Sequence, residues 1–123
     1  MKVIKRNLLP LITLIFIFGC VESFVQSSYK TLSVSKEAYN STLLMAGSLY
    51  KQGLMTEAQK DEAIKYGNLY MQTHNESVNA LLTYKTSGLV SDKDKYLALM
   101  ADTSARLATL IEYLKPFILK ETN

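Results

Sequence analysis

The sequence of 123 residues contains no tryptophan, only one cysteine, one histidine and two prolines. A single cysteine cannot form an internal disulfide bond, and one histidine with one cysteine supplies too few ligands for a usual zinc site. The sequence also lacks a glycine-rich phosphate loop, paired carboxylates on one helix face and a haem attachment motif. We therefore expect a protein that is not an enzyme and that holds no cofactor and no metal.

The first 20 residues fall into three zones of different composition. A basic segment with Lys2, Lys5 and Arg6 comes first, an apolar stretch covers residues 8–18, and Gly19 and Cys20 follow. A charged segment, a short apolar stretch and a small residue are together typical of a secretory signal peptide. The apolar stretch is shorter than the roughly 20 residues that a membrane-spanning helix needs. The sequence thus predicts a signal peptide over residues 1–19.

The segment Ile17-Phe18-Gly19-Cys20 resembles the processing box of bacterial lipoproteins, which ends in an invariant cysteine. The resemblance implies removal of residues 1–19, a thioether-linked diacylglycerol on Cys20 and acylation of the new amino terminus. It also implies a position in the outer membrane, facing the periplasm, because Val21 is not the aspartate that retains such proteins in the inner membrane. Two alternatives are an uncleaved membrane anchor and ordinary secretion with a free thiol.

Processing at Cys20 would remove the excess of positive charge. The whole chain has a net charge of +3, but three of its 14 basic residues precede Cys20 and none of its 11 acidic residues does. The remainder is neutral and has no electrostatic attraction for nucleic acid, so we expect no nucleic-acid partner. A remainder of about 100 residues suits one domain with one modest core.

Capping residues divide the rest of the chain into three helices. Hydroxyl side chains favour a helix start, whereas glycine after a helix, or proline within one, favours its end. Connections this short make neighbouring helices antiparallel. We therefore expect an all-α, up-down-up bundle of three helices over residues 35–123, after a signal peptide and a short tether over residues 20–34. The expected starts are Ser35, Thr56 and Ser91, and the expected ends are Gly53, Gly88 and the region of Pro116.

Apolar residues recur in each expected helix at steps that suit about 100° of rotation per residue. Each set should form the face that the helix turns toward the core. The expected faces are Tyr39, Thr42, Leu43, Ala46, Leu49 and Tyr50 in the first helix; Ala63, Ile64, Gly67, Tyr70, Met71, His74, Val78, Leu81 and Leu82 in the second; and Tyr96, Leu99, Met100, Thr103, Leu107, Leu110 and Leu114 in the third, which Phe117 and Ile118 would extend.

The first expected helix is about half as long as the second and can cover only the half that begins at Thr56. The other half needs a second neighbour, because a soluble protein rarely exposes a large apolar surface. Residues 24–32, a partner protein or a second copy of the chain would each serve. We expect residues 24–32 to cover it, either packed on the bundle or as a backward extension of the first helix.

His74 lies near the centre of the apolar face of the second expected helix, level with Thr103 of the third. We interpret His74 and Thr103 as one buried polar layer of structural character. A catalytic interpretation would add Asp102 with Ser77 or Ser104. Residues in a helical core offer neither an open pocket nor an oxyanion site, so the structural interpretation is preferred.

These observations lead to two hypotheses about function. The first is a small envelope lipoprotein, anchored to membrane lipid through acylated Cys20, whose helical domain is a structural or protein-interaction module. Its partner would be another protein or a second copy of the chain. The second is a carrier of small ligands with a crevice lined by Tyr66, Tyr84 and Tyr113.

Overall fold

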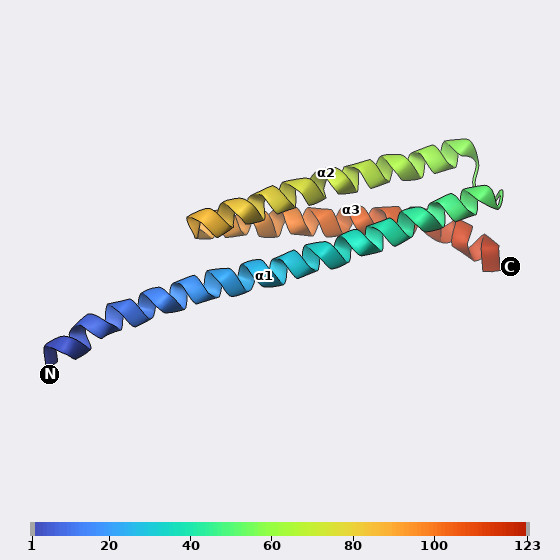
Figure 1. Cartoon of the computed structure of the whole chain (residues 1–123). Coiled ribbons are helices and arrows are strands. Elements are labelled where there is room, and N and C mark those ends of the chain that lie inside the picture. The colour runs from blue at the N-terminus through green and yellow to red at the C-terminus, as the bar shows by residue number, and fades with distance from the viewer. Residues whose placement is uncertain (1, 123) are drawn as a thin grey trace.

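Three long helices make up the structure, a computed structural model that describes the backbone of residues 2–122 and the side chains of residues 20–121. Helix α1 spans Lys2–Lys51, α2 spans Glu57–Ser87 and α3 spans Val90–Thr122. The three lie side by side and alternate in direction, and the N-terminal part of α1 extends past the end of the α2–α3 hairpin (Figure 1). The expected all-α, up-down-up bundle is confirmed.

Helix α1 begins far earlier than the sequence predicts, because it passes through Ser35 without a break. The Ser35 hydroxyl does not cap a helix; its oxygen lies 2.7 Å from the Tyr70 hydroxyl on α2. Residues 20–34, expected as a tether, are helical, and Val25 and Leu32 are buried. This is the backward extension that the sequence left open, and it covers the second half of α2. The side chains of the expected signal peptide, residues 1–19, lie outside the described residues.

The connection between α1 and α2 has the predicted chemistry. Gly53 has a φ of 76°, and its N–H donates to the Tyr50 carbonyl while the Leu54 N–H donates to the Leu49 carbonyl, both at 3.0 Å. This pair of bonds closes the end of α1 and directs the following apolar residues back onto the bundle. Thr56 then starts α2, as expected, and forms a capping box with Gln59.

The connection between α2 and α3 is shorter, and the start of α3 after Gly88 differs from the prediction. Gly88 ends α2, as expected, in the left-handed conformation with a φ of 66°. However, α3 begins at Val90, so Ser91 lies inside the helix and does not cap it. The hydroxyl at this turn is instead that of Ser87, which accepts from the Leu89 N–H at 3.1 Å and donates to Asp92.

Buried positions recur at alternating steps of three and four residues, which is the heptad spacing of packed, supercoiled helices. Ile64, Leu82 and Tyr50, expected inside, are exposed. Each directly follows a buried residue, and adjacent residues of a helix point about 100° apart, so only one of the two can face the core. Ser77 takes the inward position that the sequence assigned to Val78. The buried residues of α2 are Ala63, Gly67, Tyr70, His74, Ser77, Ala80, Leu81 and Tyr84, and all but Ala80 follow this spacing.

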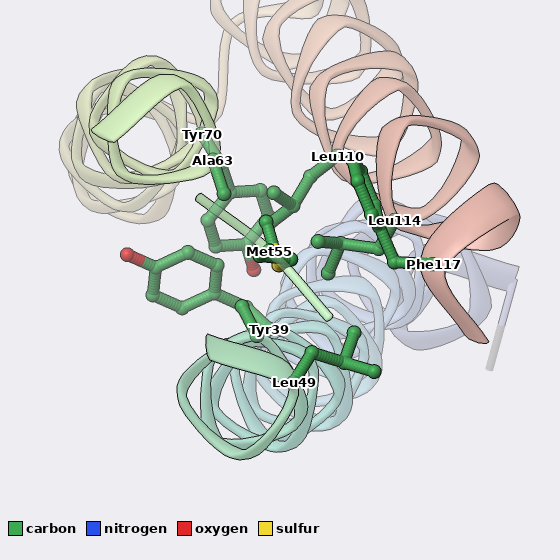
Figure 2. Close-up of a cluster of buried hydrophobic side chains, with 9 residues drawn as sticks. Tyr39, Leu49, Met55, Ala63, Tyr70, Leu110, Leu114 and Phe117 are labelled. Atoms are coloured by element: carbon green, nitrogen blue, oxygen red, sulfur yellow. The ribbon is translucent and has the colours of Figure 1, made fainter. Parts of the chain in front are cut away.

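The buried apolar side chains form two clusters along the bundle axis. The Met55 cluster lies near the first connection, and in Figure 2 its side chains converge from all three helices. The Leu81 cluster lies near the second connection. The Met55 cluster contains Tyr39, Ala46, Leu49, Met55, Ala63, Tyr70, Leu110, Leu114 and Phe117; the Leu81 cluster contains Val25, Leu32, Ala80, Leu81, Tyr84 and Tyr96.

Pro116 lies inside α3 and does not end it. The last turns of the helix, drawn in red, incline away from the direction of the rest in Figure 1. A bend is expected where proline removes one backbone hydrogen bond and its ring displaces the preceding turn. Leu114 and Phe117 on both sides of the proline are buried, so the bend does not interrupt the packing.

Gly67 lets α1 and α2 approach closely, and we predict that Gly67→Leu destabilises the protein by about 1–3 kcal/mol through overpacking. A Cβ atom there would lie 3.2 Å from the Tyr39 hydroxyl oxygen, and the Tyr39 ring is held by stacking on Tyr70. Gly47 is the matched control, because its added Cβ would meet nothing within 4 Å. Gly47→Ala should stabilise the helix by about 0.5–1 kcal/mol. Urea unfolding followed by circular dichroism measures both, and equal stabilities would contradict the close approach at Gly67.

Candidate functional site

A belt of polar side chains lies between the Met55 cluster and the Leu81 cluster. Ser77 and Thr103 join α2 to α3 through hydroxyl oxygens 3.0 Å apart. The Ser35–Tyr70 hydroxyl pair joins α1 to α2. On the same two helices, the His74 Nε2–H donates to the carbonyl oxygen of Leu32 at 3.3 Å. The belt therefore ties all three helices together at mid-length.

His74 and Thr103 are both buried, as expected, but no hydrogen bond joins them. The partner of Thr103 is Ser77, one turn along α2 from His74. The other ring nitrogen of His74, Nδ1, is buried without a hydrogen-bond partner. Of the residues that the catalytic interpretation adds, Asp102 and Ser104 are exposed, whereas Ser77 is buried. The Ser77 hydroxyl bonds to Thr73 and Thr103 and not to His74, whose bond is to Leu32. The structure thus does not join His74, Asp102 and a serine into one hydrogen-bonded site.

Three tyrosine phenols have a pKa raised above the ordinary value. Burial raises the pKa of Tyr39 and, as the largest of several causes, that of Tyr70, where the Ser35 hydrogen bond acts in the opposite direction. Burial is also the largest cause that raises the pKa of Tyr113, and the negative charge of Glu62 adds to it. At physiological pH these phenols act as hydrogen-bonding groups and not as acids.

The tyrosines expected to line a ligand crevice are packed against other side chains. The rings of Tyr66 and Tyr113 lie with centroids 5.2 Å apart, and the Tyr113 hydroxyl donates to the Gln59 carbonyl oxygen at 3.2 Å. Tyr84 is buried and meets the edge of the Phe24 ring at a centroid distance of 5.5 Å. Tyr66 and Tyr113 pack against the Met55 cluster and Tyr84 belongs to the Leu81 cluster, so the three tyrosines do not line a common crevice.

An open groove of about 400 Å³ runs between α1 and α3, the pair of helices with the least contact. None of its lining residues is charged, and two large apolar ones, Val34 and Ile111, are 65% and 42% exposed. Small residues stand one turn apart on both walls, which brings the helix backbones within reach of a neighbour. The lining consists of Thr31, Val34, Ser35, Ala38, Met100, Ser104, Leu107, Ala108 and Ile111.

Sequence reasoning did not single out this groove. Its walls come from the edges of two helices, and their rotation about their own axes decides which edges face each other. The only signal in the sequence is the small-residue spacing of Ser35 and Ala38 on α1 and of Ser104 and Ala108 on α3. That spacing is also common on solvated helix surfaces, so it did not distinguish the groove from any other face.

Cys20 is exposed on α1, close to the end of the α2–α3 hairpin. One turn further along, the Phe24 ring packs edge-on against Tyr84 of α2 and Tyr96 of α3, with the Lys93 ammonium 4.5 Å from its centroid. The residue expected to carry lipid is therefore followed at once by packed helix and not by a flexible segment.

No family model, no curated protein and no solved structure matches this chain. Within the part of the chain whose side chains are described, no helix is long and apolar enough to cross a membrane. Among the same residues, no three histidine, cysteine, aspartate or glutamate side chains come together in a way that would hold a metal ion.

We predict that His74→Leu retains the helical content and changes the free energy of unfolding by less than about 1.5 kcal/mol. The substitution removes one hydrogen bond, worth about 0.5–1.5 kcal/mol, but also removes the unpartnered Nδ1, whose burial costs about 1–3 kcal/mol. Leu81→Ala at a fully buried position is the contrast and should cost about 2–5 kcal/mol. Urea unfolding measures both. A His74→Leu protein that cannot fold would contradict the small predicted cost, and one that keeps its fold but loses a measurable activity would refute the purely structural role.

Proposed function

We propose that this chain is a small bacterial envelope lipoprotein, held by lipid on Cys20, whose helical domain acts as a structural or protein-interaction module. The basic segment, the apolar stretch and the box that ends at Cys20 support the anchor. The exposure of Cys20 is compatible with acylation there. Val21 favours the outer membrane over the inner one, with the domain in the periplasm. The domain is not an enzyme and binds no nucleic acid.

The observation that carries the interaction role is the uncharged groove between α1 and α3. It stays open even though α1 runs along the whole α2–α3 hairpin, so the chain's own helices do not fill it. An amphipathic helix laid into such a groove would bury Val34 and Ile111. The small residues on both walls would let its backbone come close, as in tightly packed helix pairs.

An interaction module is better supported than a carrier of small ligands. The tyrosines that would line the carrier's crevice are packed against one another or buried. The α1–α3 groove is open along its length, whereas small-molecule sites enclose most of the surface of their ligand. A helix of a partner protein, or of a second copy of this chain, fits a long open groove better.

Palmitate labelling of cells should mark the wild-type protein and should not mark the Cys20→Ser variant, because only the cysteine sulfur can take the thioether-linked diacylglycerol. The native amino terminus is read by mass spectrometry of the same sample, and we expect it at Cys20. Equal labelling of both proteins, or a native chain that still begins at Met1, would refute the lipid anchor.

A photocrosslinking side chain placed at Ile111 should capture a partner in cells, whereas one at Leu44, an exposed apolar residue outside the groove, should not. Ala108→Arg should abolish the crosslink by filling the groove with a charged side chain. Ala105→Arg, on the exposed surface of the same helix, should leave it intact. Both positions are exposed, so neither variant should unfold the bundle. A crosslink insensitive to Ala108→Arg would contradict the groove as the interface.

A further inference from the structure

The α2–α3 turn carries an exposed apolar tip, Leu89 and Val90, which are 58% and 71% exposed. The corresponding apolar pair of the other connection behaves differently: Leu54 is half-buried and Met55 is only 4% exposed. The two connections share a glycine followed by leucine and a second apolar residue. One pair is part of a core and the other faces away from the bundle.

The tip lies at the same height as Cys20 along the bundle axis. Phe24 packs on Tyr84 and Tyr96 and so fixes the register of α1 against the hairpin. From Phe24 back to Cys20 is about 6 Å of helix rise, and from Tyr96 back to Val90 is about 9 Å in the same direction. Cys20 and the Leu89–Val90 tip therefore lie within a few ångströms of the same plane, perpendicular to the bundle axis.

Cys20 is connected rigidly to the bundle. Helix α1 is continuous from Cys20 onward, and both Val21 and Phe24 pack against the Leu81 cluster. A flexible tether would let the domain drift away from a membrane, but a packed helix that starts at the acylated residue does not. The end of the domain must stay at the depth at which the lipid holds Cys20.

Charges around the tip are balanced. Lys85, Lys93 and Lys95 are offset by Glu22, Asp92 and Asp94 of the same end. Such a surface has no net attraction for anionic lipid headgroups, so it can bind a membrane only through apolar contact. Lysine stems near an interface extend their ammonium groups toward the headgroups and do not oppose this contact.

We infer that the Leu89–Val90 tip rests in the surface of the lipid bilayer that holds the acyl chains of Cys20, so that the bundle stands upright on the membrane. The inference depends on the proposed lipid anchor and goes beyond it, because a lipid on Cys20 alone does not specify how the domain is oriented. It also places the α1–α3 groove perpendicular to the membrane, where a neighbouring protein can approach it from the side.

The test uses the native full-length protein after processing in its own cells, with Leu89→Cys labelled by an environment-sensitive fluorophore. Acylated Cys20 has no free thiol, so the introduced cysteine is the single labelling site. Gln52→Cys, exposed at the opposite connection, is the matched control. Both proteins are reconstituted into phosphatidylcholine vesicles that contain lipid with a nitroxide near the headgroup end of an acyl chain.

We expect the label at position 89 to shift its emission to shorter wavelength and to be quenched several-fold more than the label at position 52. Adding phosphatidylglycerol or salt should change the quenching little, because the contact is apolar. Val90→Asp in the Leu89→Cys protein should weaken it. Little quenching at either position, or equal quenching at both, would overturn the inference.

Mass spectrometry of the same samples separates the two proposals. An acylated protein without quenching at position 89 refutes the membrane-resting tip and leaves the lipid anchor standing. A protein without acyl chains refutes the anchor, and the inference that depends on it is overturned as well. Quenching at position 89 in an acylated protein supports both.

Discussion

Backbone hydrogen bonds carry α1 without interruption through residues 20–51, and this continuity is the constraint on which the rest of the structure depends. Because α1 reaches the end of the α2–α3 hairpin, Val25 and Leu32 can complete the Leu81 cluster, which would otherwise have only two helices around it. A two-helix hairpin buries too little apolar surface to be stable by itself. The same continuity fixes Cys20 relative to the bundle, so that a lipid attached there, as proposed, would hold the domain in one orientation.

The polar belt at mid-length restricts how the three helices can slide along one another. Two apolar clusters of similar character would tolerate a slip of one heptad, since apolar side chains of similar size can replace each other. A slip would separate Ser77 from Thr103 and Ser35 from Tyr70. Ser77 and Thr103 would keep their bonds to the Thr73 and Leu99 carbonyl oxygens of their own helices. The cost therefore falls on the buried Tyr70 hydroxyl, which would lose its bond to Ser35, and an unpaired buried hydroxyl costs about 1–3 kcal/mol. A buried polar position is a well-attested way to fix helix register, and here it is joined by the packing of the Tyr39 ring on Gly67.

The sequence predicted the number of helices, their direction and the chemistry at Thr56, Gly53 and Gly88, because these are decided by a few neighbouring residues. It failed where a tertiary contact competes with a local preference. Ser35 has the hydroxyl of a helix cap, yet that hydroxyl is used by Tyr70 on another helix. Hydrophobicity predicts Val78 and not Ser77 at the inward position, whereas the core at this level takes a polar residue. The α1–α3 groove depends on helix rotation, which no local pattern contains.

The two connections show how chain length overrides residue chemistry. Five residues separate α1 from α2, and this is enough for the chain to leave the helix end, place Met55 between the helices and begin α2. Two residues separate α2 from α3, so the chain has no room to fold its apolar pair back, and Leu89 and Val90 remain outside. Polar residues at these two positions would cost the bundle almost nothing, since they contribute little to either cluster. Packing within the domain therefore gives no reason for apolar side chains at this end, whereas contact with a lipid surface at the height of Cys20 does.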